Sequence, residues 1–211
     1  ELLTPGATME MAWMPDRPGT WLMHCHLPFH VTSNIGFGAD ALSNKEFEER
    51  VTHIHGGNPD RHVEDQMGGL FMSITVPPPR GWTLPTAPRK VITFEVPRDS
   101  VAGDVVPAFS PTVTDGANVS RPAVRAGPGG MLLLHQHEPT TVRVLNQTRE
   151  HLAIHWHGME LESLYDGVVG IGGTPGKRTR AVVPGASFDA RMTPPHAGTF
   201  IYHTHLLEVR Q

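Results

Sequence analysis

Three short motifs in this sequence place histidines two residues apart, a spacing that suits a metal site on an extended strand. The motifs are His24-Cys25-His26 with His30 shortly after it, His155-Trp156-His157, and His203-Thr204-His205. Successive side chains of a strand point to opposite faces, so each histidine pair shares one face, with about 6.6 Å between its members along the strand. Imidazole suits copper, and a thiolate combined with imidazoles is typical of a blue-copper electron-transfer site. The residue types and spacing therefore predict copper redox chemistry.

Cys25 is the single cysteine of the chain, so it cannot form an intramolecular disulfide. A lone cysteine is most simply a small buried hydrophobe, but its two histidine neighbours argue against that interpretation here. On a strand, Cys25 would point away from His24 and His26. One strand could then carry two metal sites back to back, and the following loop could bring His30 toward the thiolate.

Two segments of the chain align without a gap at an offset of 179 residues, over 5–27 and 184–206. Both begin with Pro-Gly-Ala, contain a Gly-Thr pair and end in His-x-His-Leu. The repeat predicts two copies of one domain type. The first copy has few residues ahead of this segment and the second ends soon after it, so we expect both domains to be incomplete and to expose strand edges.

The 22 Gly and 20 Pro residues indicate frequent turns and an all-β protein with many short strands. We expect one short helix, from a capping box at Ser43 to about His53. A Pro-rich stretch favours a division into domains at 1–78 and 89–211 with a linker over 79–88. The predicted strands are 7–14, 19–26, 69–77, 90–96, 131–137, 140–146, 152–157, 179–183, 186–193 and 198–205.

The three motifs within a domain repeat resemble the multicopper oxidase family, which includes laccases, ferroxidases and bilirubin oxidases. The resemblance implies two incomplete cupredoxin-like Greek-key β-sandwich domains in tandem, with copper of types 1, 2 and 3 as the cofactor. It also implies oxidation of a small electron donor, phenol-like or a metal ion, coupled to reduction of dioxygen to water. A periplasmic or extracellular location follows by family analogy alone.

The resemblance implies a role for each matching residue. Cys25 and His30 would bind the type 1 copper, and His155 would bind the type 2 copper. The type 3 pair would be held by His24, His26, His157, His203 and His205. Asp166 resembles the acidic residue that delivers protons near the cluster, although an Asp before Gly is also a common turn residue.

The sequence departs from the family pattern in three ways. The motif His-Pro-x-His-x-His is absent, which agrees with a truncated first domain and predicts an inactive fragment. The axial position of the type 1 site falls on Ile35, which cannot bind copper. His-Cys-His precedes His-Trp-His-Gly, so the cluster could close between these two domains, with more remote cupredoxin domains, or across subunits of a homotrimer.

Two other functions compete with an oxidase. A copper nitrite reductase lacks His-Cys-His and His-Trp-His-Gly, so it fits poorly. A copper-binding or electron-transfer cupredoxin without oxidase activity remains the alternative. The net charge of −4 gives no electrostatic case for nucleic acid, and the apolar runs are too short for a membrane span. No signal peptide is visible, but Glu1 leaves room for an upstream segment.

Several other residues have chemistry-bearing side chains but simpler explanations. The histidines at 53, 55 and 62 fall in a polar stretch and are expected to be solvated. His135 and His137 are expected on a framework strand of the sandwich. The methionines at 9, 11 and 14 are expected to pack in the core and not to act as a copper relay.

Overall fold

The computed structural model of the protein describes residues 4, 6–25, 71–86, 89–97, 111–121, 129–149 and 151–205. Within these ranges every regular element is a strand apart from the 3-10 turn η3 (Ser163–Tyr165), so the predicted all-β class is confirmed. The predicted helix at 43–53 lies outside the described residues. The strands are β1 Gly19–His24, β2 Phe71–Val76, β3 Lys90–Val96, β4 Thr112–Asp115, β5 Asn118–Ser120, β6 Thr140–Asn146, β7 Ile154–His157, β8 Gly173–Thr174, β9 Lys177–Arg178, β10 Ser187–Met192 and β11 Ile201–Thr204.

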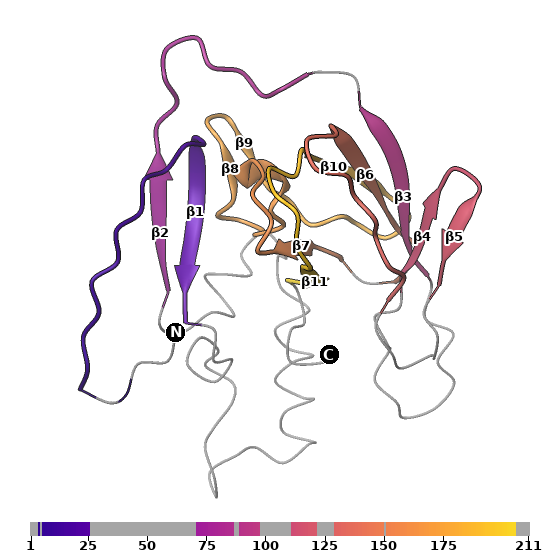
Figure 1. Ribbon diagram of the computed structural model, residues 1–211, viewed down its shortest axis with the longest axis horizontal. Coiled ribbons are helices and arrows are strands. Elements are labelled where there is room, and N and C mark those ends of the chain that lie inside the picture. Colours follow the sequence, from indigo (N-terminus) through magenta and orange to yellow (C-terminus); the bar gives the residue numbers. More distant parts are fainter. Residues whose placement is uncertain are drawn as a thin grey trace, which may run out of the picture.

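The strands form three sheets, which Figure 1 shows side by side. One sheet has the order β2-β1-β8-β9, the second β10-β6-β3-β4-β5, and the third contains only β11 and β7. The β3–β6 pair is parallel and the other pairs are antiparallel. Segments from the two halves of the chain are thus hydrogen-bonded to each other, because β1 pairs with β8.

The main core lies between the five-stranded sheet and the β7–β11 pair. Ile92, Phe94 and Val96 alternate with outward-facing residues on β3, and β6 repeats this pattern with Val142 and Val144. This alternation is what a sheet requires when one face is buried and the other is solvated. The result is two layers of strands packed through apolar side chains. The five-stranded sheet thereby fixes the position of β7 and β11.

The sheet that contains β1 is held mainly by its ladder with β2. The register runs from Gly19 opposite Val76 to His24 opposite Phe71. The contact with β8 is short, with Thr20 opposite Gly173. A small apolar cluster also joins this sheet to the second half of the chain, as Leu22, Cys25 and Phe71 pack against the buried Val168.

Three predicted strands are wrong. Residues 7–14 and 131–137 form no ladder, and within 179–183 only Val182 forms an isolated bridge, with Leu152. Both longer segments have the alternating pattern of a strand, but a strand exists only where a neighbour supplies hydrogen bonds. In the second copy of the repeat that neighbour is β6, which pairs along the whole of β10. The aligned segment at 8–13 has no such partner among the described residues.

The prediction that the N-terminal methionines pack in the core is also wrong. Met9, Met11 and Met14 are all exposed, Met14 with 92% of its surface accessible. Their segment has no partner strand in the described part of the chain, so nothing covers the side that would face a core. Trp13 packs edge-on against Trp21 of β1, with 6.3 Å between the ring centroids.

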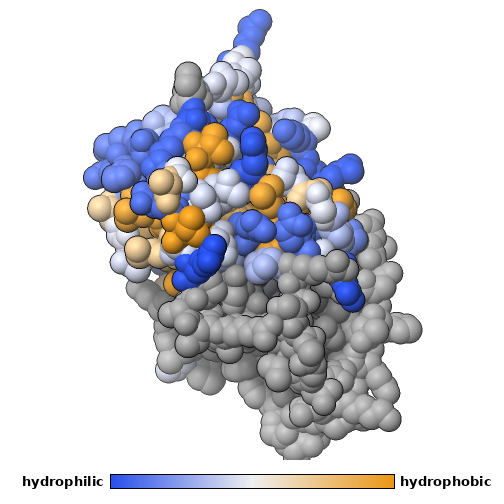
Figure 2. All heavy atoms as spheres, turned by 90° about the vertical axis from the view of Figure 1, so that its right-hand side faces the viewer, coloured by the Kyte–Doolittle hydropathy of each residue, from blue (hydrophilic) through white to orange (hydrophobic). Residues whose placement is uncertain are grey.

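The face shown in Figure 2 mixes hydrophilic and hydrophobic residues. Ion pairs contribute to the exposed side of the five-stranded sheet, among them Lys90 with Asp115 and Arg143 with Asp189. Within the described ranges, no helix has the length and apolar character needed to cross a bilayer.

Candidate metal centre

Four histidines gather on one face of the β7–β11 pair. His155 of β7 stands directly opposite His203 of β11, and their ring centroids are 5.2 Å apart. His157 shares the face two residues along β7, and His205 follows β11, with its backbone N–H donating to the carbonyl of Ala153. The ligand atoms offered by His155, His157 and His203 all lie within 4.8 Å of one another. This grouping follows directly from two His-x-His motifs on paired strands.

The opposite face of the same two strands anchors them in the core. Trp156 and Tyr202 stand opposite each other, and both rings pack edge-on against Phe94, at 5.5 and 4.9 Å between ring centroids. Trp156 is buried, with 3% of its surface exposed. The hydroxyl of Tyr202 donates to the carbonyl of Gly130 at 2.8 Å, and burial raises the pKa of Tyr202 to about 12. The aromatic residues hold the histidine-bearing strands against the five-stranded sheet.

A fifth histidine arrives from the other end of the chain. His24, the last residue of β1, has its ring centroid 6.4 Å from that of His205. His205 is buried, with 1% of its surface exposed, and also lies 5.7 Å from His155. The cluster of five imidazoles thus combines one residue from the first half with four from the second.

Hydrogen bonds define which nitrogen of three rings could bind a metal. The Nδ1 atoms of His24, His155 and His203 lie 2.7–2.9 Å from the backbone carbonyls of Cys25, Asp166 and Thr204. A carbonyl oxygen only accepts, so Nδ1 must carry the proton, and Nε2 is the atom that can offer a lone pair. Metal-binding histidines almost always donate their second N–H in this way. The donor set therefore fits copper, for which imidazole is a suitable ligand.

Asp166 lies directly beside one of these histidines. Besides the backbone contact, its carboxylate Oδ1 is 3.2 Å from Nδ1 of His155, and both side chains are largely shielded from solvent. Gly167 makes the approach feasible, because it has a φ of +83° and a Cβ there would lie 2.0 Å from the carbonyl oxygen of Ile154. Asp166 is thus both a residue that ends a turn and a contact of the histidine cluster, so the two interpretations of the sequence are compatible.

Two models of one family match this sequence. Both are described as multicopper oxidase, one over residues 2–38 and the other over residues 125–211, and together they cover more than half of the chain. This chain belongs to the multicopper oxidase family. The two matches include all three histidine motifs.

Individual multicopper oxidases resemble parts of the chain. Laccase-1 of Emericella nidulans is 36% identical over 80 residues, which are 37% of this chain and 12% of that protein. The copper resistance protein A homolog of Pseudomonas syringae pv. tomato is 33% identical over 78 residues, again 37% of this chain and 12% of that protein. A solved multi-copper oxidase from Pseudomonas Parafulva has 26% identity and a TM-score of 0.38, covering 56% of this chain and 26% of its own. The matched region thus spans about an eighth of the length of these curated relatives.

The remaining residues predicted for a multicopper oxidase are only partly described. Cys25 follows β1 directly and is half-buried, where it packs in the cluster around Val168. His26, His30 and Ile35 lie outside the described residues, as do the histidines at 53, 55 and 62.

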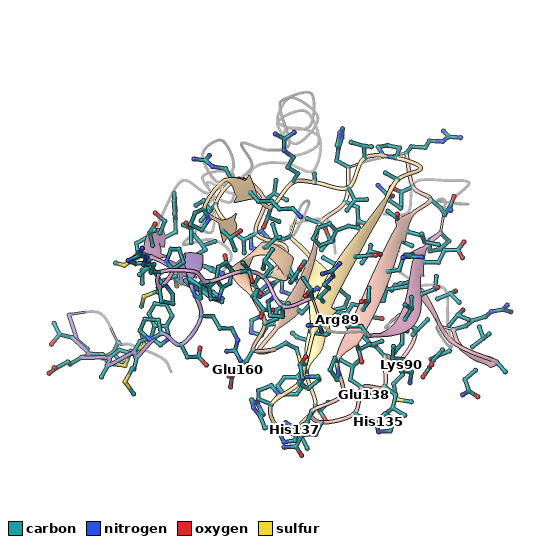
Figure 3. The ribbon with its side chains drawn as sticks, turned by 90° about the horizontal axis from the view of Figure 1, so that it is seen from above. Arg89, Lys90, His135, His137, Glu138 and Glu160 are labelled. Atoms are coloured by element: carbon teal, nitrogen blue, oxygen red, sulfur yellow. The ribbon has the colours of Figure 1, made fainter. Side chains whose placement is uncertain are left out.

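His135 and His137 stand apart from the five-histidine cluster. Both are exposed on the turn that precedes β6, which Figure 3 shows at the edge of the molecule together with Glu138. His137 has a φ of +62°, and its N–H donates to the carbonyl of Pro194. The expected framework strand is replaced here by this turn.

One buried polar residue near Asp166, Ser163, is not among the site residues predicted from the sequence. Ser163 begins η3, three residues before Asp166, and its hydroxyl bonds to the backbone of β1 and β8. No spacing or motif in the sequence marks this serine, because both of its partners are backbone groups of distant residues.

Proposed function

We propose that the complete protein couples one-electron oxidation of a small donor, phenol-like or a metal ion, to the four-electron reduction of dioxygen to water. The observation that carries this proposal is the convergence of His24 with the four histidines of β7 and β11. Bound copper would supply the single-electron chemistry between the donor and dioxygen. The side chains of this chain would bind the copper, orient it and manage protons.

The residues divide into an electron entry and an oxygen-reducing cluster. Cys25 and His30 would hold the type 1 copper, and His155 the type 2 copper. The type 3 pair would be held by His24, His26, His157, His203 and His205. Cys25 is linked to His24 through one peptide bond, so the thiolate and the cluster are joined by a short covalent path.

Asp166 would hold a proton next to the cluster. Its carboxylate lies at Nδ1 of His155, and its backbone carbonyl accepts from the same N–H. This arrangement supports two roles, fixing the orientation of His155 and supplying protons to oxygen during its reduction.

The assembly of the site is also part of the proposal. We assign residues 1–78 and 89–211 to two cupredoxin domains joined by the linker 79–88. Proximity of His24 to His205 favours a cluster that closes between these neighbours. Further ligands would come from another cupredoxin domain or from a neighbouring subunit, and a periplasmic or extracellular location fits the family.

Oxygen uptake tests the proposal directly. The full-length, copper-loaded protein is given a phenolic donor beside a Cys25→Ser variant, and the blue absorption of each is recorded. We expect uptake and blue colour in the parent protein and neither in the variant. Blue colour without oxygen uptake in the parent would contradict oxidase activity and favour a copper-binding or electron-transfer protein.

A further inference from the structure

We propose that Ser163 is a positioning residue that fixes the distance between β1, which carries His24, and the histidines of β7 and β11. This inference rests on the proposed function, because it assigns Ser163 to the assembly of the same copper cluster.

The Ser163 hydroxyl joins three segments of the chain. It donates to the carbonyl of Thr20 in β1 and accepts from the N–H of Gly173 in β8, at 2.9 Å for the second bond. Ser163 is 1% exposed, so these bonds are shielded from water. Burying a hydroxyl is unfavourable unless it forms hydrogen bonds. The Ser163 hydroxyl meets this requirement by bonding to both β1 and β8.

The chain approaches Ser163 too closely for any side chain at Gly19. A Cβ on Gly19 would lie 2.7 Å from Cβ of Ser163 and 2.8 Å from the carbonyl oxygen of Gly173. The repeat aligns Gly19 with Gly198, where a Cβ would instead meet the ring of its own neighbour Phe200 at 2.9 Å. In the first copy of the repeat, this glycine therefore has a different role, because it allows close contact with the other half of the chain.

The turn η3 carries this contact to the cluster. The N–H of Asp166 donates to the carbonyl of Ser163 at 3.3 Å, and the carbonyl of Asp166 accepts from Nδ1 of His155 at 2.7 Å. Ser163, at the start of this short turn, is thus hydrogen-bonded to β1, and Asp166, at its end, orients His155. Thr20 lies four residues before His24, on the same face of β1, so displacement of Thr20 would move His24 relative to His155.

Other contacts between the halves are less directional. Leu22 and Phe71 pack against Val168, which supplies apolar contact without a preferred angle. Arg17 reaches Glu160 at 3.2 Å, but Glu160 is half exposed and is also paired with His196. Exposed ion pairs of this kind contribute little, so the buried Ser163 bonds are the better candidate for setting the separation.

A matched pair of variants tests this role. Ser163→Ala removes the hydroxyl that reaches β1. Thr179→Val removes a buried hydroxyl that donates to two carbonyls of the same turn, those of Leu164 and Ser163, and that makes no bond to β1. Both are made in a Cys25→Ser background, and Cu(II) affinity of the histidine cluster is measured by competition with a chelator. We expect an affinity loss of about ten-fold for Ser163→Ala, as for other residues that orient ligands, and no loss for Thr179→Val. Equal losses in both variants, or none in Ser163→Ala, would overturn the proposal.

Two further readouts separate the possible failures. With Cys25 intact, Ser163→Ala should keep its blue absorption, because the thiolate is not held by the Ser163 bonds. In the unmutated protein, Cu(II) should slow hydrogen exchange at the Gly173 amide, since coupling through this contact is reciprocal. If copper binds and hydrogen exchange at the Gly173 amide is unchanged, the positioning role is overturned. This result does not depend on whether Ser163→Ala folds. Absence of oxygen uptake by the unmutated protein would instead reject the proposed function.

Discussion

The ring of His24, at the end of β1, lies 6.4 Å from the ring of His205, which follows β11 near the other end of the chain. Neither strand pairs with the other; each is held by its own neighbours, β2 for the first and β7 for the second. The link between the two halves runs through η3, because the Ser163 hydroxyl donates to the carbonyl of Thr20 in β1, and through β8, which belongs to the same sheet as β1 and pairs with it.

Trp156 supports the histidine strands from the core side. We expect Trp156→Ala to lower the free energy of unfolding by about 3–5 kcal/mol, because it empties a buried aromatic site beneath β7. Trp13→Ala is the control, since Trp13 is half exposed and its edge-on contact with Trp21 is worth about 1 kcal/mol. Urea denaturation measures both losses, and similar values for the two variants would contradict the assigned core.

Gly167 allows the loop after η3 to approach His155. Gly176 has nearly the same backbone angle, with φ of +79° against +83°, but an added Cβ meets nothing within 4 Å. Gly176→Ala should therefore lower the free energy of unfolding only by the strain of a left-handed residue, about 1–2 kcal/mol. Gly167→Ala adds a collision with the carbonyl of Ile154, so it should lower the free energy of unfolding by more. It should also weaken copper binding. Thermal unfolding of both variants measures this difference. Equal decreases in melting temperature for the two variants would mean that the close approach at Gly167 is not required.

Asp166 is expected to act through its charge and its proton. Asp166→Asn keeps the backbone carbonyl that accepts from His155 but loses the carboxylate, so cluster affinity for Cu(II) should fall by about ten-fold. Oxygen uptake should also be slower, since an amide cannot supply a proton to oxygen during its reduction. Asp16→Asn, at an exposed position, serves as the control. An unchanged rate of oxygen uptake would remove Asp166 from proton delivery.

The Asp189–Arg143 pair should make a small acid-sensitive contribution to stability. The hydrogen bond from Arg143 lowers the pKa of Asp189 below its ordinary value of 3.8. A lowered pKa means that the pair stabilises the fold above pH 3.8 and loses this effect as pH falls through the folded value. Both side chains are partly exposed, so solvent screening keeps the effect small. The difference in melting temperature between the parent and Asp189→Asn should shrink between pH 5 and pH 3, and a difference that grows would contradict the pairing.

Strands with a clear alternating pattern could be predicted from the sequence. The bounds of β3 and β6 agree with the prediction to the residue, and β7, β10 and β11 fall within their predicted ranges. In each of these strands, the side chains of one face enter the core. Apolar residues therefore alternate with other residues along the sequence, and this alternation can be recognised. The shared face of each histidine pair follows from the same period of two.

The remaining features depend on partners that a local pattern does not identify. Segment 131–137 alternates correctly, with Leu132 and Leu134 turned toward the core, but the N–H of Met131 bonds to the Ser120 side chain and not to a ladder. The β4–β5 hairpin was missed although Asp115-Gly116 is a common turn signal. Contact between η3 and β1 is between a serine and backbone groups, which leaves no mark in the sequence.

The central claim is that histidines from both halves of the chain bind copper as one cluster, and a double-mutant cycle on His24 and His205 tests it most directly. The full-length protein, His24→Ala, His205→Ala and the double variant are each titrated with Cu(II) in a Cys25→Ser background. If both imidazoles serve one centre, each single variant loses most of the affinity and the double variant loses little more. Two independent losses that add in the double variant would mean that His24 and His205 do not act together, and the cluster between the two halves would have to be abandoned.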